Sequence, residues 1–205
     1  MKIVEDRRAL HRIPELDNDL PQTMAYLEQA LAGLKCRVFS PMQSALCAWF
    51  DFGQESAIAF RSDADALPIQ EKTGAAFASC HPGKMHACGH DSHAAMVLGA
   101  ARILNDHKDE LSGKIYVCFQ KGEEVGIGAR DIVEYLKEQG GVDKAFGLHI
   151  AANLPTGFIS LTEGPSMAGA CNWQGVVKGK GGHGSMPYAS IDPIKPLAEI
   201  LLRVT

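Results

Sequence analysis

Apolar runs of strand length alternate with segments of helical periodicity through the middle of this 205-residue chain. The run "GKIYVCFQ" (113–120) is rich in aromatic and β-branched residues and predicts a buried strand. In "HAAMVLGAARILNDH" (93–107) apolar residues recur at helical spacing, which predicts a helix that begins near Ser92 and buries one face. Such alternation is typical of an α/β domain with a largely parallel sheet, in which ligands bind at the strand ends.

The remaining patterns extend this alternation. Helices are predicted over 21–34, from the glycine turn at 126–128 to Gly140, and from Asp192 as N-cap; strands are predicted over 44–53, 56–69, 144–150 and 157–164, with a glycine-rich strand and loop over 172–187. The composition changes around "TEGPSM" (162–167), which indicates a domain boundary there. We therefore expect one domain over 1–165 and the beginning of a second, incomplete one over 166–205.

Composition and charge exclude several classes of partner and compartment. A net charge of -4, without long runs of one sign, gives no electrostatic footprint for nucleic acid or an anionic membrane. The N-terminal stretch mixes both signs of charge and lacks an apolar run of signal-peptide length, and nowhere do eighteen apolar residues run together, so a cytoplasmic protein is expected. The six cysteines are scattered, which favours free thiols over a disulfide framework.

The stretch "MHACGHDSHAA" (85–95) concentrates one cysteine, three histidines and one aspartate in eleven residues. Cys88 and His90 are two residues apart, so on an extended loop both can turn toward one point. Thiolate and imidazole together are a ligand set that zinc and its first-row neighbours prefer. The pair predicts a metal site only if other ligands join it, because a polar loop can contain the same residues.

Two further features supply such ligands at the ends of predicted strands. Glu123 and Glu124 follow the apolar run, and Gly126 and Gly128 provide the turn that lets both carboxylates serve one site. One can hold a metal while the other takes a proton from water, although a solvated acidic turn is an open alternative. His149 lies at the end of the next predicted strand, where it is either a metal ligand or a core or rim histidine. Together with the Cys-x-His pair, these residues predict one metal centre.

Seven motifs occur in an order that resembles a known family: "RRALHRIPEL", "FRSDADALPIQE", "MHACGHDSHAAMVLGAARIL", "FQKGEEVGIGAR", "GLHI", "MAGA" and "GKGGHGSMPYASIDPI". They resemble the metallo-amidohydrolases of the aminoacylase and carboxypeptidase-like zinc-peptidase superfamily, in the branch of hippurate, auxin-conjugate and aminobenzoyl-glutamate hydrolases and N-acetyldiaminopimelate deacetylases. The resemblance spans nearly the whole chain. It implies a zinc-peptidase-like α/β catalytic domain with a mostly parallel central sheet flanked by helices, followed by the start of a small α+β lid or dimerisation domain.

The resemblance also implies roles for the metal-seeking residues. Cys88, His90, Glu124 and His149 match the ligands of two divalent metal ions, and Glu123 matches the general acid and base. Thiolate ligation favours zinc, with manganese, cobalt and nickel as alternatives. A water activated by metal charge attacks the amide carbonyl in this chemistry.

Three more polar residues fall on family positions. Asp65 matches a carboxylate that orients a metal ligand, whereas Asp63 is left open between a site role and a structural turn. His183 matches a lid histidine that reaches a neighbouring subunit's site and stabilises the oxyanion, which implies a homodimer; a plain glycine-loop histidine is the alternative. Tyr188 stands where the family often has a histidine, which puts a substrate contact there in doubt.

The function that follows is metal-dependent hydrolysis of the amide bond of N-acyl amino acids, or of dipeptides. The family's later region completes the lid and adds a histidine ligand, and this sequence stops before it, at Thr205. The alternative is therefore a truncated, non-catalytic metal-binding or assembly fragment. A covalent mechanism with Cys88 as nucleophile and His90 as base ranks below both, because residues two apart on a loop rarely align and the glutamate pair would be unexplained.

Overall fold

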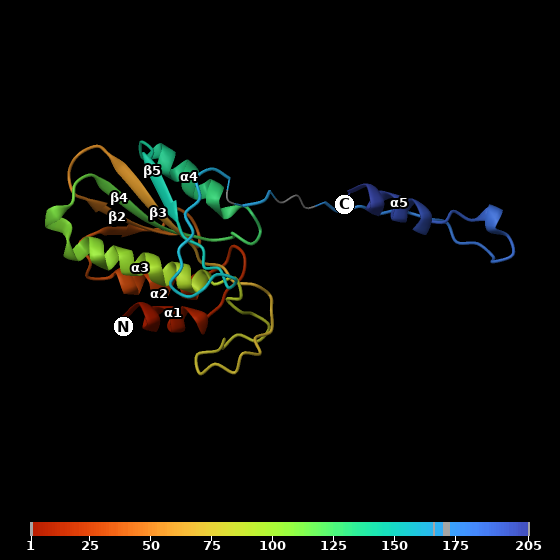
Figure 1. The fold of residues 1–205 in the computed structure, drawn as a ribbon, viewed down its shortest axis with the longest axis horizontal. Coiled ribbons are helices and arrows are strands. Elements are labelled where there is room, and N and C mark those ends of the chain that lie inside the picture. The colour runs from red at the N-terminus through yellow and green to blue at the C-terminus, as the bar shows by residue number, and fades with distance from the viewer. Residues whose placement is uncertain (1, 166, 170–172, 205) are drawn as a thin grey trace. The chain divides into compact units, whose positions relative to one another are not determined.

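The computed structural model describes residues 2–165, 167–169 and 173–204. The chain divides into two compact units, with the division after Leu154. The first unit contains a five-stranded sheet and its covering helices, and the second contains a short 3-10 helix and a terminal α-helix (Figure 1). The predicted domain boundary between 165 and 166 stays a prediction, and Ser166 itself lies outside the described residues.

The sheet of the first unit is mixed but runs mostly in one direction. Its strands are β1 (Arg37–Phe39), β2 (Leu46–Asp51), β3 (Ala57–Asp63), β4 (Lys114–Gln120) and β5 (Lys144–Gly147), in the order β1-β2-β4-β3-β5. The strand β3 pairs in parallel with β4 and β5, whereas β2 is antiparallel to both of its neighbours. Every strand except β2 therefore points the same way, which confirms the predicted α/β class with a mostly parallel sheet.

The strand β4 lies at the centre and is buried on both faces. Ile115, Val117 and Phe119 contribute to the core on one face of the sheet, and Tyr116 and Cys118 contribute to the core on the other. Successive side chains of a strand point to opposite faces, so a strand covered on both sides must be apolar throughout. This is why "IYVCF" lacks polar alternation.

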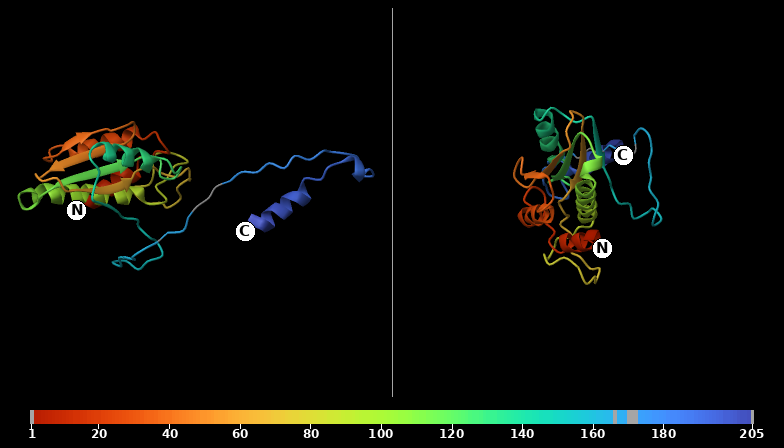
Figure 2. Two further views of the ribbon diagram at one scale, coloured as in Figure 1. Left: turned by 90° about the horizontal axis from the view of Figure 1, so that it is seen from above. Right: turned by 90° about the vertical axis from the view of Figure 1, so that its left-hand side faces the viewer.

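Helices cover the two faces unequally. Three helices, α1 (Lys2–His11), α2 (Pro21–Leu31) and α3 (His90–Asp106), lie on one face, and α4 (Gly128–Glu138) lies on the other (Figure 1 and Figure 2). The helix α3 begins two residues earlier than predicted, so His90 is its first residue. None of the helices in the described part of the chain combines the length and the apolar character needed to cross a membrane.

The connections of β3 and β4 determine where a site can form. The chain leaves β3 through α3 on one face and leaves β4 through α4 on the other face. Adjacent parallel strands whose connections go to opposite faces leave a crevice beyond their carboxyl ends. The loops after β3 and β4 therefore border the position where ligands bind in folds of this kind.

The second unit departs most from the sequence predictions. The strand predicted over 157–164 is wrong: these residues form no strand, and Ile159 and Leu161 are 74% and 90% exposed, so neither a partner strand nor a core stabilises an extended ladder. The strand predicted within 172–187 is also wrong for the described residues 173–187, whose only β-structure is an isolated bridge that joins Lys180 to Ile191. Asn172 lies outside the described residues. The terminal helix α5 (Ile194–Val204) forms as predicted, and the Asp192 side chain accepts a hydrogen bond from the Ile194 N–H, at 2.9 Å.

Candidate metal centre

Four segments that are distant in the sequence supply the candidate metal centre. They are the residues after β3, the loop that enters α3, the turn after β4 and the segment after β5. Because β3, β4 and β5 are parallel neighbours, their carboxyl ends lie at one edge of the sheet. The side chains that follow these strands are therefore brought together by the fold.

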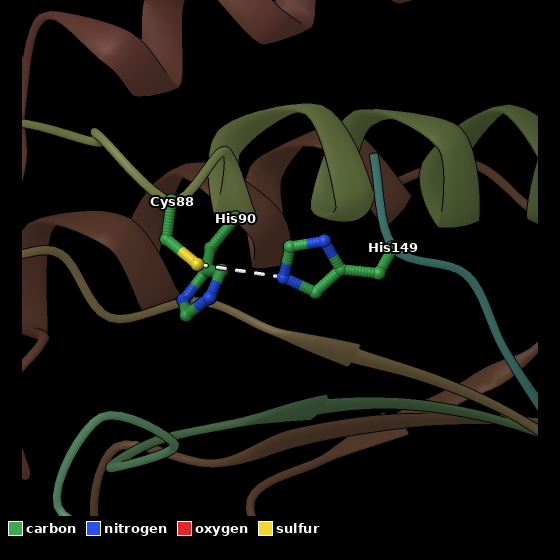
Figure 3. Close-up of side chains that lie close together, drawn as sticks. All are labelled: Cys88, His90 and His149. Atoms are coloured by element: carbon green, nitrogen blue, oxygen red, sulfur yellow. Dashed lines mark hydrogen bonds between the residues drawn. The ribbon is translucent and has the colours of Figure 1, made fainter. Parts of the chain in front are cut away.

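Cys88, His90 and His149 form the first group of candidate ligands (Figure 3). Their ligand atoms all lie within 4.8 Å of one another, and the Cys88 Sγ is 3.4 Å from the His149 Nε2. Ligand atoms bound tetrahedrally at about 2.0–2.3 Å from zinc are separated from each other by about 3.3–3.7 Å. The spacing of the sulfur and the imidazole nitrogen thus fits two ligands of one ion.

His90 also belongs to a second group, with Glu123 and Glu124. Its Nε2 atom lies 3.8 Å from Glu123 Oε2 and 3.7 Å from Glu124 Oε1. Its Nδ1 atom donates to the backbone oxygen of Asp65, at 2.8 Å, which leaves the lone pair of Nε2 facing the carboxylates. The pKa of His90 is raised: burial lowers it, but the interaction with the Asp65 carboxylate and the charges of the surrounding carboxylates outweigh burial.

Two buried atoms of this group lack partners. Within the described chain, neither the His90 Nε2 nor the Glu124 Oε1 has a hydrogen-bond partner, although both are shielded from solvent. A buried polar atom without a partner costs about 1–3 kcal/mol. A divalent cation between these atoms would satisfy both of them. A donor set of sulfur, imidazole nitrogen and carboxylate oxygen is one that zinc and similar ions accept, so the residues present fit a divalent metal.

Asp65 connects two of the ligand-bearing segments. Its carboxylate accepts a hydrogen bond from the backbone N–H of Glu124, at 3.0 Å, while its backbone oxygen receives the His90 Nδ1 proton. The residue is fully buried. One residue thus contacts both the His90 ring and the Glu124 backbone, and its orienting role toward a metal ligand stays a prediction.

His93 is a polar residue of the centre to which the sequence analysis gave no role. Its Nδ1 donates to Asp63 Oδ1 at 2.6 Å, and its Nε2 accepts from the Ile150 N–H at 3.0 Å. Asp63 also pairs with Arg61, at 3.1 Å, so it is more than a turn residue. Burial raises the pKa of Asp63, but the His93 hydrogen bond and nearby positive charges lower it below its usual value. The three-residue spacing from His90, which places both rings on one helix face, could have identified His93.

Cys88 has an unusual electrostatic environment. Burial, followed by the charge of Glu124 and then that of Glu123 and Asp63, raises the pKa of the Cys88 thiol to about 12. The thiol is therefore protonated at neutral pH when no cation is present. A bound cation reverses this effect, because a coordinating thiol is deprotonated.

His183 lies in the second unit. Its Nδ1 atom accepts a hydrogen bond from the Ser185 N–H, at 3.3 Å, and lies 2.9 Å from the Ser185 hydroxyl. Tyr188 lies in the short 3-10 helix Pro187–Ala189 and is 84% exposed. The first unit brings Cys88, His90, Asp65, Glu123, Glu124 and His149 together, whereas the predicted role of His183 stays a prediction.

The fold and these contacts define an α/β protein with a candidate divalent-metal centre beyond the carboxyl ends of its parallel strands. The chain belongs to peptidase family M20/M25/M40, whose model matches residues 59–164. This match confirms the family resemblance expected from the ordered motifs.

Individual relatives show how much of the family architecture the chain represents. It is 39% identical to an N-acetyl-L-cysteine deacetylase of Bacillus subtilis, over 98% of this chain and 49% of the relative, and 38% identical to the IAA-amino acid hydrolase ILR1-like 5 of Arabidopsis thaliana, over 96% and 45%. The crystal structure of the Bacillus subtilis YXEP protein, described as a dinuclear metal-binding peptidase from the M20 family, superposes with a TM-score of 0.74 at 38% identity, over 80% of this chain and 46% of that one. The chain thus spans about half the length of the curated relatives it matches.

Proposed function

We propose that this chain carries the metal-binding part of an enzyme that hydrolyses the amide bond between an acyl group and an amino acid. The observation that supports this proposal most strongly is the position of His90. Its buried Nε2 atom has no hydrogen-bond partner and faces the carboxylates of Glu123 and Glu124. Membership of the M20 family supports the proposal. So do the names of the two relatives above, because N-acetylcysteine and an IAA-amino acid are both N-acyl amino acids.

In this proposal Cys88, His90, Glu124 and His149 hold two divalent ions, with zinc favoured over manganese, cobalt and nickel. Bound metal supplies the positive charge that lowers the pKa of water and polarises the scissile carbonyl. Glu123 accepts the proton of the attacking water and passes it to the leaving nitrogen. His183 reaches the site of a neighbouring subunit and donates to the developing oxyanion there.

The two glutamates divide these tasks because their environments differ. The side chain of Glu124 is 22% exposed, and the Asp65 carboxylate anchors its backbone. The side chain of Glu123 is 40% exposed, so it can meet water and substrate. The better-held carboxylate suits a ligand, and the more accessible one suits proton transfer.

The test is hydrolysis of N-acetyl and N-benzoyl amino acids by the purified 205-residue chain, with dipeptides as a comparison. We expect turnover that is lost on chelation and restored by adding Zn²⁺, Mn²⁺, Co²⁺ or Ni²⁺. Turnover that survives chelation but is abolished by thiol alkylation would contradict this mechanism and favour Cys88 as a nucleophile.

A non-catalytic fragment is the second candidate, because the chain spans about half of its relatives. In that case the chain binds metal stoichiometrically but hydrolyses none of the substrates.

The proposal also includes a homodimer formed through residues 166–205 and a cytoplasmic location. Sedimentation analysis and cell fractionation test them, and a monomer or a secreted protein would contradict them.

A further inference from the structure

The backbone of Ile150 makes hydrogen bonds to two histidine rings, those of His93 and His149. Its N–H donates to the His93 Nε2 at 3.0 Å, and its carbonyl oxygen accepts from the His149 Nδ1 at 2.6 Å. Among the described residues, no backbone–backbone hydrogen bond outside the β3–β5 ladder involves residue 149 or 150. Apart from the contact of the His149 Nε2 with Cys88, the hydrogen bond that ties this segment to the rest of the unit is therefore the one from Ile150 to the His93 ring.

These hydrogen bonds allow only one arrangement of protons. A backbone N–H can only donate, so the His93 Nε2 must carry a lone pair, and the ring proton is on Nδ1. That proton is donated to Asp63 Oδ1, and the other oxygen of Asp63 receives Arg61. By the same reasoning the His149 proton is on Nδ1, because Nδ1 faces a carbonyl oxygen. The His149 Nε2 is thus left with a lone pair that faces Cys88, as a metal ligand requires.

His93 also contacts His149 directly. The two ring centroids are 4.5 Å apart, with an angle of 65° between the ring planes. His93 is 1% exposed and lies near the start of α3, three residues after His90. A buried ring on a helix thus supports a ligand that itself lies on an exposed segment without regular structure.

We propose that Asp63 and His93 are positioning residues that fix the tautomer and the direction of His149. Their consequence for metal binding rests on the proposed function, whereas the hydrogen bonds themselves belong to the metal-free protein. Residues that orient a ligating histidine typically change metal affinity by about 10–100-fold when they are substituted. We expect an effect of that size from the loss of the bond between His93 and Ile150.

A matched pair of substitutions separates this role from simple burial. In His93→Gln the amide oxygen can reach the position of Nε2 and accept the Ile150 N–H. In His93→Asn the amide nitrogen can reach the position of Nδ1 and donate to Asp63, but the shorter side chain cannot reach Ile150. The inference predicts that Gln preserves the arrangement of His149 and that Asn does not.

The first readout is the ring ¹⁵N spectrum of His149 in the metal-free chain, assigned with a His149→Ala variant. We expect the Nδ1–H tautomer in the wild type and in His93→Gln, and a mixture of tautomers in His93→Asn. An unchanged single tautomer in His93→Asn would overturn the inference. If His93→Asn does not fold, Asp63→Leu takes its place, because it removes the acceptor of the His93 Nδ1 proton, and an unchanged tautomer there would overturn the inference equally.

The second readout is the dissociation constant for Zn²⁺, measured by competition with a chelator. We expect a loss of about 10–100-fold in His93→Asn and agreement within about twofold between His93→Gln and the wild type. In a His149→Ala background, His93→Asn should weaken binding no further, since it acts through the missing ligand. An equal loss in both backgrounds would show that His93 acts on the metal independently of His149, and would overturn the inference.

The two proposals can fail separately. If the wild-type chain binds no divalent metal, the proposed function is wrong, yet the tautomer of His149 still decides the inference. If metal binds tightly and His93→Asn changes neither readout, the inference is wrong and the proposed function stands.

Discussion

Glu123 and Glu124 are adjacent in the sequence but differ in the surroundings of their carboxylates. Glu123→Gln should lower the rate of hydrolysis by about 10²–10⁴-fold, the usual contribution of a general base, and leave metal content unchanged. Glu124→Gln should instead weaken metal binding, because an amide replaces the ligand oxygen that lacks a partner. Metal analysis combined with turnover measurements on both variants checks this. Retained activity in Glu123→Gln would refute its assignment as the base.

Cys88 makes metal binding depend on pH. Its thiol has a pKa of about 12 because of burial and the nearby carboxylates, so a metal ion must displace a proton from it. With one proton released, affinity should rise about tenfold per pH unit between about pH 7.5 and 9. Calorimetry in buffers of different ionisation enthalpy measures the released proton. Cys88→Ser should bind more weakly and lose this slope, and a wild-type affinity independent of pH would contradict thiolate ligation.

At the scale of elements, a buried ion pair joins α1 to α3. The His11 Nδ1 lies 2.7 Å from Asp91 Oδ2, and this hydrogen bond raises the pKa of His11. The folded state therefore binds the proton more tightly than the unfolded chain does. The resulting stability is fully present below the ordinary histidine pKa of about 6.5, and it is lost as the pH rises through the raised value.

His11→Gln tests this contribution. We expect it to lower the free energy of unfolding by about 1–3 kcal/mol at pH 6 and to remove part of the loss that the wild type shows toward pH 9, since His90, whose pKa is also raised, contributes the same kind of loss. Urea denaturation across this range is the measurement. The control His107→Gln replaces an exposed histidine and should keep the wild-type slope. An identical slope in His11→Gln would show that His11 does not carry the pH dependence.

The entry into α3 depends on Gly89, which has a φ of +98°. A Cβ atom added there would overlap the side chain of Ile150. Gly89→Ala should therefore cost about 1–2 kcal/mol of stability for the backbone conformation and also displace the segment that carries His149. Gly140→Ala is a matched control, since Gly140 has a φ of +100° with open space around it. Zn²⁺ affinity should fall in the first variant alone, and equal affinities would contradict the contact.

At the scale of the whole molecule, apolar patterns in the sequence predicted the central elements. The strand β4 is covered on both faces, which requires the continuous apolar run over 113–120. The helix α3 buries a face that includes Val97, Leu98 and Ala101, so its periodicity is clear. Both apolar patterns arise because these elements bury apolar side chains at the sheet.

Elements that are stabilised by buried polar contacts show no comparable apolar pattern in the sequence. The helix α1 was not predicted because the residues it buries include Asp6 and His11 as well as Leu10. Asp6 is fully buried and bonds Arg102 and Tyr26, which lie far away in the sequence. The strand predicted over 157–164 was wrong for the opposite reason, because an apolar pattern forms no strand without a partner.

The same contrast applies to the site. Ligand types at strand ends predicted a group of Cys88, His90, His149 and one of two adjacent glutamates, since the topology gathers those ends. The family resemblance singled out Glu124 as the ligand. The part played by His93 depends on the backbone N–H of Ile150. A backbone group carries no residue-specific signature, so this contact could be identified only from the structure.

X-ray absorption at the zinc edge tests the central claim most directly, because it identifies the atoms around the metal. With one equivalent of Zn²⁺ bound to the chain, the account predicts one sulfur neighbour at about 2.3 Å and nitrogen or oxygen neighbours at about 2.0–2.2 Å. The sulfur should disappear in Cys88→Ser. A shell of light atoms alone in the wild type, or a sulfur that persists in Cys88→Ser, would contradict the metal centre described here.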